Sequence, residues 1–297
     1  MRKRILKYFS GLVLIIVGVY AYLLFSAGPI ADHSYFRTDH FLVIAHRGGR
    51  SLGPESTVYT FQKAIDLGVD VIEIDIRSTN DGKLVIMHDD TVNRTTNGNG
   101  PVNRFSLREL KRLDAGFRWS PDNGRTYPMR GKGLTIPTLA EAFAALPKIR
   151  MNIEIKESRP EVIALLCDLI RDYQKTDHVM VASFDVSPLK QFRSQCPQIA
   201  TSMSAREAFV FYGLQWAHLD NIYSPAAQAL QVPGTYGNTQ VVTQRFLKAA
   251  HARNMRVHVW TVNEPQHMQR LLKLGVDGIM TDYPERLLKL LGRNTKN

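Results

Sequence analysis

Short runs of β-branched residues alternate with helical patterns along most of this chain, and the alternation limits the folds open to it. Residues 41–297 contain eight strand signals and a weaker ninth near Ile222, most of them followed by a segment with helical periodicity. The signals are FLVIAH, VDVIEIDI, KLVIMH, IRMNIEIK, HVMVASF, IATSMS, a segment near Ile222, RVHVWTV and DGIMT. Alternating strands and helices form a mainly parallel α/β sheet. About eight such units in about 250 residues predict a TIM-type (β/α)8 barrel.

A doubly wound open sheet is the alternative fold. It has less support, because the first strand is followed by HRGGRSLGPE, which lacks the G-x-G-x-x-G spacing of dinucleotide-binding folds. Two polar, turn-rich stretches, residues 93–104 and 116–133, are predicted to be surface loops. Long loops on a compact barrel often serve as lids or rims, although insertions without a role have the same appearance.

A long apolar segment lies near the N-terminus. Phe9–Ala27 is 19 residues long and carries no charged side chain. Four basic residues precede it: Arg2, Lys3, Arg4 and Lys7. A helix of this length nearly crosses a hydrocarbon core of about 30 Å. The positive charge predicts a cytoplasmic segment (1–8), a transmembrane anchor (9–27), a linker (28–40) and an extracytoplasmic domain (41–297). A cleaved secretory signal is the second interpretation.

Charge and cysteine content exclude several other classes. The net charge is +11, but outside the N-terminal cluster there is no basic helix or arginine run with interleaved aromatics, so nucleic acid is not a predicted partner. A mildly basic body suits anionic substrates or membrane surfaces. Cys167 and Cys196 are too few for a disulfide scaffold. The apolar pattern around Cys167 predicts a buried thiol, although an extracytoplasmic domain would meet oxidising conditions.

Three carboxylates are predicted to meet at one end of the barrel. Glu73 and Asp75 are two residues apart in VIEIDI, so both point to one face of their strand, and Glu154 and Lys156 repeat the spacing in NIEIK. Barrel strands deliver such residues to the C-terminal mouth, where barrel active sites lie. An all-oxygen ligand set favours Mg²⁺ or Ca²⁺ over zinc. The alternative is a structural ion network of the carboxylates with Lys156 and Arg47.

Two histidines also stand at the ends of predicted strands, His46 in FLVIAH and His88 in LVIMH. Cleavage of a phosphodiester requires one proton to leave the nucleophile and another to reach the leaving alkoxide. A histidine can perform either transfer, and each contributes about 10²–10⁴-fold to the rate. Arg47 and Lys156 are suited to the non-bridging phosphate oxygens.

Several other chemistries have no sequence support. The chain contains no G-x-S-x-G nucleophile elbow and no H-E-x-x-H zinc motif. Among the other histidines, His258 is closest to an exception, since it lies within the RVHVW strand. Trp260 ends that strand, where it would either stack on an apolar part of a substrate or fill the top of the barrel.

These residues lie in segments that resemble the glycerophosphodiester phosphodiesterase family. The matching segments are HRGGRSLGPEST, GVDVIEIDIRSTNDGKLVIMHDDTVNRTTNG, FSLRELKRLDAG, IPTLAEAF, MNIEIK, VHVWTVN and GVDGIMTDYP. The resemblance extends from about His46 to Pro284, with several motifs in the right order. It implies a (β/α)8 barrel that hydrolyses glycerophosphodiesters to glycerol 3-phosphate and an alcohol with a divalent cation.

The resemblance also assigns residues to roles. It implies that His46 and His88 are catalytic. It implies metal ligands at Glu73, Asp75 and Glu154 and substrate contacts at Arg47, Lys156 and Trp260. One position departs from the family's usual P-E-N-T, since this chain has Ser56 in place of the asparagine. Serine can cap or bond locally, so we expect tuning of the site.

Two further functions remain open from the sequence. One is a lysophospholipase D-like activity on lysophospholipids, with Phe117, Trp119 or Tyr127 in contact with an acyl chain. The other, from a different class, is a non-catalytic, membrane-tethered binding barrel. That interpretation predicts the loss of a histidine or carboxylate, and the sequence keeps all of them. The predicted partners are therefore a small-molecule or lysolipid phosphodiester and the membrane.

Overall fold

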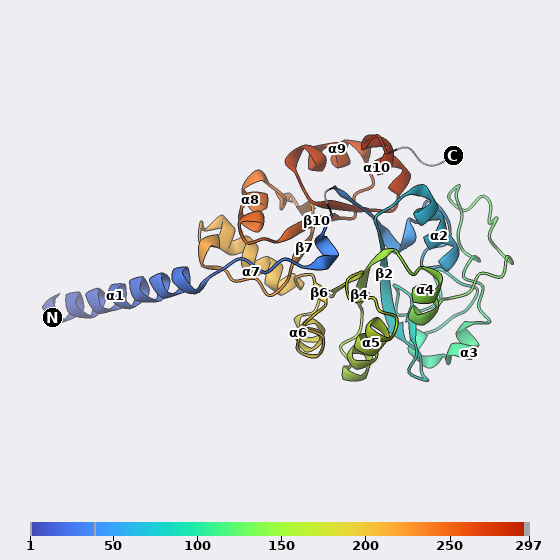
Figure 1. The fold of residues 1–297 in the computed structure, drawn as a ribbon, viewed down its shortest axis with the longest axis horizontal. Helices are drawn as coiled ribbons and strands as arrows, with labels where there is room; N and C mark the ends of the chain where they lie inside the picture. The colour runs from blue at the N-terminus through green and yellow to red at the C-terminus, as the bar shows by residue number, and fades with distance from the viewer. Residues whose placement is uncertain (1, 39, 294–297) are drawn as a thin grey trace.

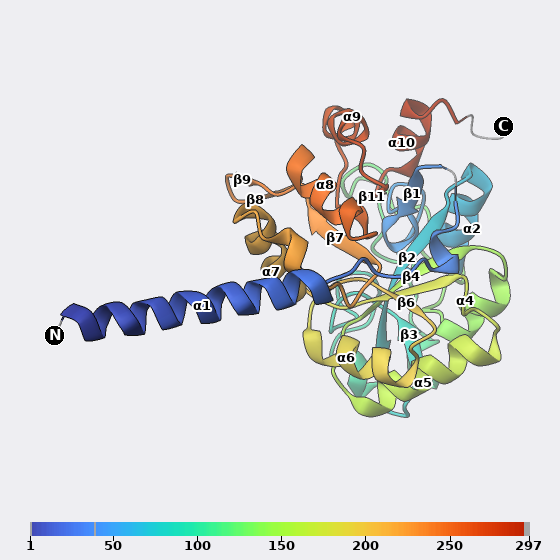
Figure 2. The ribbon, with the colours of Figure 1, turned by 60° about the vertical axis from the view of Figure 1, so that its left-hand side comes forward.

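The computed structural model describes residues 2–38 and 40–293, without the side chains of residues 2–7. In this part of the chain, eight parallel strands form a nearly closed ring with eight helices outside it, and the helix α1 (Arg2–Ser26) projects from the body (Figures 1 and 2). The predicted (β/α)8 barrel is confirmed. Residue 1 of the predicted cytoplasmic segment and residues 294–297 of the predicted barrel domain lie outside the described residues.

The barrel strands follow one another around the ring in chain order. They are β1 (Leu42–Ala45), β2 (Val71–Ser78), β4 (Arg150–Ile155), β5 (Val179–Ala182), β6 (Ala200–Thr201), β7 (Ala229–Pro233), β10 (Arg256–Trp260) and β11 (Gly278–Thr281). A parallel bridge between Ser202 and Ala229 links the two ends of the sheet. The ring is thereby almost complete, and its carboxyl ends face one mouth.

One helix follows each barrel strand. These helices are α2 (Val58–Leu67), α4 (Leu139–Ala145), α5 (Pro160–Asp172), α6 (Val186–Gln195), α7 (Ala205–Trp216), α8 (Gln244–Ala252), α9 (Pro265–Leu274) and α10 (Pro284–Leu290). The remaining elements are the short α3 (Leu107–Leu110), the strands β3 (Leu84–Ile86), β8 (Thr235–Tyr236) and β9 (Thr239–Gln240), and the 3₁₀ turns η1 (Ser34–Phe36), η2 (His46–Gly48), η3 (Val102–Arg104) and η4 (Asp220–Ile222).

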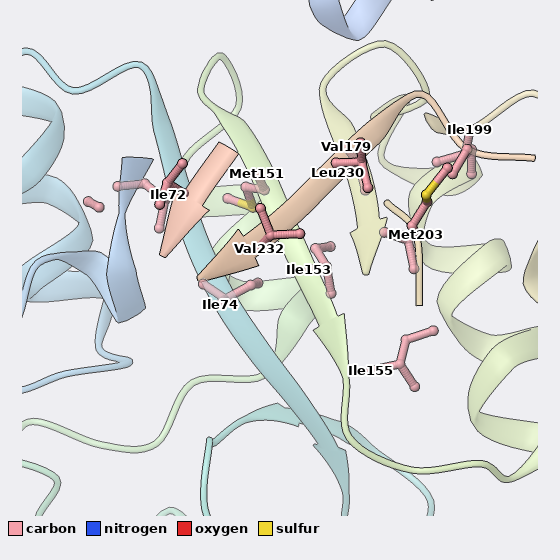
Figure 3. Close-up of a cluster of buried hydrophobic side chains, with 14 of the residues drawn as sticks. Ile72, Ile74, Met151, Ile153, Ile155, Val179, Ile199, Met203, Leu230 and Val232 are labelled. Carbon is pink, nitrogen blue, oxygen red and sulfur yellow. The ribbon is translucent and has the colours of Figure 1, made fainter. Parts of the chain in front are cut away.

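The main core lies between the strands and the helices. Along β2, Ile72 and Ile74 belong to this layer, while Glu73 and Asp75 line the cavity inside the barrel. Figure 3 shows part of the layer, where isoleucines of β2 lie near Met151 and other residues of β4. The period of two along each strand therefore separates an apolar outer face from an inner face that carries polar groups.

The structure corrects three sequence predictions. The segment KLVIMH forms β3, which pairs antiparallel with β2 as a hairpin and is not a barrel strand. The strand expected near Ile222 is wrong, because that residue lies in the 3₁₀ turn η4. The barrel strand in this region is β7, whose sequence ALQVP lacks a run of β-branched residues. The cysteine prediction is also wrong, because Cys167 on α5 and Cys196 after α6 form a disulfide.

A buried histidine in the barrel interior makes stability depend on pH. His258 is fully buried, and among the described residues neither of its ring nitrogens has a hydrogen-bond partner. Burial lowers its pKa from 6.5 to about 4. The unfolded chain therefore takes up a proton below pH 6.5 that the folded chain refuses, and the free energy of unfolding falls between pH 6.5 and 4.

We expect this effect to reach about 3 kcal/mol, the free energy that corresponds to the difference between the two pKa values. Urea unfolding from pH 7 to pH 4 measures it, with His258→Leu as the comparison. The wild-type profile should fall more steeply than that of the variant. Parallel profiles over this range would show that His258 does not cause the loss.

Candidate active site

A cavity of about 650 Å³ opens at the carboxyl ends of the barrel strands. Each of the eight barrel strands, or the loop after it, contributes to its lining. The lining includes all the residues predicted for the site: His46, Arg47, Glu73, Asp75, His88, Glu154, Lys156 and Trp260. The fold therefore brings together groups that lie up to about 200 residues apart in the sequence.

Two neighbouring strands carry the three carboxylates. Asp75 on β2 lies directly beside Glu154 on β4, and Glu73 is two residues before Asp75 on the same face. One oxygen from each carboxylate lies within 4.8 Å of the others. Burial, with repulsion from Asp75 and Glu154, raises the pKa of Glu73 well above its usual value. We call Glu73, Asp75 and Glu154 the carboxylate trio.

Two cations contact the trio without neutralising it. Lys156 Nζ lies 2.6 Å from Glu154 Oε1 and 3.0 Å from Asp75 Oδ1. The backbone N–H of Arg47 donates to Glu73 Oε2 at 2.8 Å, and the Arg47 guanidinium also pairs with Glu55. Within the described chain, Asp75 Oδ2 is buried and has no hydrogen-bond partner. Arg47 Nε forms an ion pair with this oxygen at 3.7 Å, beyond hydrogen-bond distance. The predicted ion network therefore exists, but it leaves a buried carboxylate oxygen without a hydrogen bond, as expected of a cation site.

His46 has a carboxylate behind its ring. Its Nδ1 lies 2.7 Å from Asp282 Oδ1, and Asp282 also accepts from Asn263 Nδ2 at 2.9 Å. Asp282 follows β11, the neighbour of β1 in the barrel, so adjacent strand ends place the two side chains together. With Nδ1 held by the carboxylate, Nε2 is left free to exchange protons with a substrate.

His88 reaches the same cavity by a different route. The β2–β3 hairpin folds back on itself, and the Met87 N–H donates to the carbonyl of Asp75, which brings His88 to the level of the trio. His88 Nδ1 lies 2.7 Å from Asp89 Oδ1. Burial lowers the pKa of His88 below its usual value, and the charges of Arg47 and Lys156 act in the same direction.

An arginine cluster joins the two sides of the site. Arg94 donates to Asp89 and to both oxygens of Glu55. Burial disfavours the charge of Glu55, but the hydrogen bonds from Arg94 and the charges of Arg47 and Arg50 outweigh it and lower its pKa to about 2. Glu55 therefore stays ionised and fixes Arg47 beside the trio.

A tight left-handed turn presents His46 and Arg47. Arg47 has φ 52° and Gly48 has φ 88°, and a Cβ on Gly48 would lie 2.5 Å from the ring of Phe61. Ser56 is also left-handed, at φ 60°, and its buried hydroxyl has no partner among the described residues. Thr57, not Ser56, caps α2. Among the described residues, Ser56 therefore neither caps the helix nor forms a local hydrogen bond, and the expected tuning of the site remains a prediction.

One side of the cavity is apolar. Trp260 stacks edge-on against Phe184, with ring centroids 5.5 Å apart. Further aromatic lining comes from α7, the β8–β9 hairpin and α8: Phe209, Tyr212, Tyr236 and Phe246. Phe117, Trp119 and Tyr127, the residues predicted to contact an acyl chain, are not among the lining residues. The site therefore joins a charged end to an apolar end.

The carboxylates behind the histidines were not predicted from the sequence. Asp89 directly follows His88, and Asp282 directly follows the last barrel strand, GIMT. Asp282 carried a usable signal, because polar residues after barrel strands lie at the mouth. Asp89 follows the β2–β3 hairpin, and its signal was its position next to a predicted catalytic histidine. The aromatic lining from α7 and the β8–β9 hairpin carried no such signal, since its side chains resemble ordinary core residues.

The chain is similar to known proteins over most of its length. Residues 46–286 match the model of the glycerophosphoryl diester phosphodiesterase family. The chain belongs to this family. It is therefore a phosphoric diester hydrolase, as predicted. A glycerophosphodiester phosphodiesterase of Caldanaerobacter subterraneus subsp. tengcongensis is 34% identical, over 84% of this chain and 97% of the relative.

Two other members are informative. The structure of an Oleispira antarctica phosphodiesterase in complex with the product sn-glycerol-3-phosphate has 27% identity and a TM-score of 0.71, covering 88% of this chain and 100% of that chain. Human lysophospholipase D GDPD1 is 28% identical, over 84% of this chain and 85% of the relative. The relatives thus include one named for glycerophosphodiesters and one named for a lysophospholipid.

Proposed function

We propose that this chain hydrolyses glycerophosphodiesters to glycerol 3-phosphate and an alcohol in the cavity described above. One observation carries the proposal: the carboxylate trio shares a cavity with two histidines, each of which has a carboxylate behind its ring. The name of the Caldanaerobacter relative and the product bound to the Oleispira relative support the reaction.

The carboxylate trio would hold one divalent cation, Mg²⁺ or Ca²⁺, because both prefer oxygen ligands. The lack of a hydrogen bond to Asp75 Oδ2 among the described residues and the raised pKa of Glu73 fit this role, since Arg47 and Lys156 are two cations beside three carboxylates. When bound, such a cation supplies positive charge for the phosphate oxygens. Arg47 and Lys156 would add to that charge and orient the phosphate.

The two histidines would move the protons. One of His46 and His88 would accept the proton of the nucleophile, which is water or a neighbouring glycerol hydroxyl, and the other would donate a proton to the leaving alkoxide. Asp282 and Asp89 would hold the rings in place through Nδ1. Trp260 would contact the substrate at the rim of the cavity.

The test is product analysis with the full-length chain in detergent and glycerophosphocholine as substrate. With Mg²⁺ or Ca²⁺ we expect glycerol 3-phosphate and choline, and with a chelator we expect no release above background. Phosphocholine and glycerol as products would contradict the proposed bond cleavage. A rate unaffected by the chelator would contradict the cation site.

A lysophospholipase D-like activity is the second candidate. The observation in its favour is the apolar side of the cavity, where Phe184, Phe209 and Tyr212 could accept an acyl chain. Hydrolysis of glycerophosphocholine and of lysophosphatidylcholine should be compared on the same preparation. A higher kcat/KM for the lysophospholipid would make it the main activity, and the reverse order would leave it secondary.

We also propose that α1 anchors the protein in a membrane with the barrel on the extracytoplasmic side. Its residues Tyr8–Ser26 have a mean hydropathy of 2.2 and are not buried by the body. The basic residues before it favour a cytoplasmic N-terminus. The disulfide supports the orientation, because disulfides persist in oxidising compartments. A cleaved signal, the second interpretation, places the barrel on the same side.

The disulfide should also contribute to stability. It closes a loop with a sequence separation of 29 residues. Constraint of the unfolded chain by such a loop is worth about 3–4 kcal/mol. We expect Cys167→Ala/Cys196→Ala to lower the Tm of the protein and to remove the effect of a reductant on it. Equal Tm values for wild type and variant under oxidising conditions would contradict this contribution.

A further inference from the structure

The helix α7 has an apolar face that the body leaves exposed. Ala205, Phe209, Gly213 and Trp216 recur every three to four residues and share one side of the helix. The side chains of Phe209 and Trp216 are 75% and 74% exposed. Phe211 faces the core on the opposite side, so α7 is apolar on both faces. An exposed helix that is apolar on both faces normally contacts another protein surface or a membrane.

The neighbouring hairpin extends this apolar face. Tyr236 of β8 is 79% exposed, and it lines the cavity together with Phe209. Val210 lies beside Phe209 on α7 and is 46% exposed. We call Phe209, Val210, Trp216 and Tyr236 the apolar lip. Phe209 and Tyr236 join the lip to the cavity lining, and all four side chains are exposed at the surface.

The lip lies on the side of the body from which α1 projects. Asn221 Nδ2 of η4, the turn that follows α7, donates to Tyr20 Oη of α1 at 3.0 Å. Tyr20 is six residues before the end of α1, which is about 9 Å along the helix. Both ribbon views show α7 beside the body end of α1, and Figure 2 shows the β8–β9 hairpin on the same side. The body thus contacts α1 within its apolar segment Tyr8–Ser26, at Tyr20.

We propose that the apolar lip inserts into the interfacial region of the bilayer that α1 crosses. Lipid is the one occupant that can cover both the exposed sides of α1 and the lip next to it as a continuous apolar phase. Tryptophan and tyrosine are the residues that favour this depth. The cavity then opens at the lipid surface, so a phosphodiester with a single acyl chain enters without crossing water. The inference rests on the proposed anchor role of α1 and is independent of catalysis.

Tryptophan fluorescence tests the insertion on the full-length chain in nanodiscs. The lipids are phosphatidylcholines with or without bromine on the acyl chains, and bromine quenches only fluorophores that reach it. The chain has three tryptophans, at positions 119, 216 and 260. We expect brominated lipid to reduce emission, Trp216→Phe to abolish most of that loss, and Trp119→Phe to preserve it. Equal quenching of wild type and Trp216→Phe would overturn the proposal, as would emission unaffected by bromine.

Loss of quenching in Trp216→Phe could also result from misfolding, so a second variant is designed to regain the quenching. In the Trp216→Phe background, Tyr236→Trp should restore the quenching by brominated lipid, because Tyr236 belongs to the lip. Tyr127→Trp is the matched control, since Tyr127 is also exposed but lies in the loop 116–133, away from α1 in Figure 1. Restoration by both substitutions, or by neither, would contradict insertion of the lip. None of these measurements depends on activity. Absence of the proposed reaction can therefore be distinguished from absence of lip insertion.

Discussion

His46→Ala lowers kcat for glycerophosphocholine hydrolysis by about 10²–10⁴-fold, the contribution of one proton transfer, and leaves the fold intact. The reason is geometric. His46 lies at the cavity with its Nδ1 held 2.7 Å from Asp282, so Nε2 is free for proton exchange. Steady-state kinetics of wild type and variant at saturating cation measure the effect.

The chain offers a matched control for this substitution. His251 forms a similar pair with Asp277, at 2.8 Å, but it is not among the residues that line the cavity. His251→Ala should therefore keep wild-type kcat. Asp282→Asn should retain part of the activity, because it disturbs the orientation of His46 without removing the ring. A His46→Ala variant that lost no more activity than His251→Ala would refute the proposed proton transfer.

Glu73→Gln should weaken the dependence of activity on the cation. It removes one of three ligands from the proposed cation site, and we expect activity at millimolar Mg²⁺ or Ca²⁺ to fall at least about 10³-fold. Without a divalent cation the same change should stabilise the protein by about 1–3 kcal/mol, because Glu73 is a buried charge repelled by Asp75 and Glu154.

Thermal unfolding with and without cation separates these two effects. Wild type should gain about 2.7 kcal/mol at a cation concentration of 100 times Kd, whereas Glu73→Gln should start from a higher Tm and gain little. Glu161→Gln serves as control, because Glu161 is an exposed glutamate at the start of α5. A Glu73→Gln variant with a lower Tm in chelator and an undiminished cation response would contradict the assignment.

The barrel and its charged residues follow from short-range patterns. Glu73 and Asp75 are predictable because strand residues alternate between faces, and Glu154 because another strand ends in the same spacing. The structure brings all three together. The apolar pattern that predicts strands also led to the wrong assignment of β3 to the barrel. A strand that pairs antiparallel in a hairpin has the same apolar composition as a barrel strand.

Features that depend on distant packing were not predictable. Strand β7 contains Gln231 and Pro233, and its strand conformation depends on pairing with its neighbour β10. The disulfide requires α5 and the end of α6 to place Cys167 and Cys196 with Cα atoms 6.1 Å apart, which no pattern in either segment encodes. The apolar lip depends equally on the position of α7 relative to α1 and the cavity.

The central claim is that the carboxylate trio holds a divalent cation in the cavity that it shares with the two histidines. The most direct measurement is an anomalous difference map of crystals soaked in Mn²⁺, which shares the oxygen preference of Mg²⁺ and Ca²⁺. We predict one peak within about 2.0–2.6 Å of oxygens from Glu73, Asp75 and Glu154, the range of metal–oxygen distances for such cations. No peak at the trio, with Lys156 still paired to Asp75 and Glu154, would show that the carboxylates form a structural ion network instead.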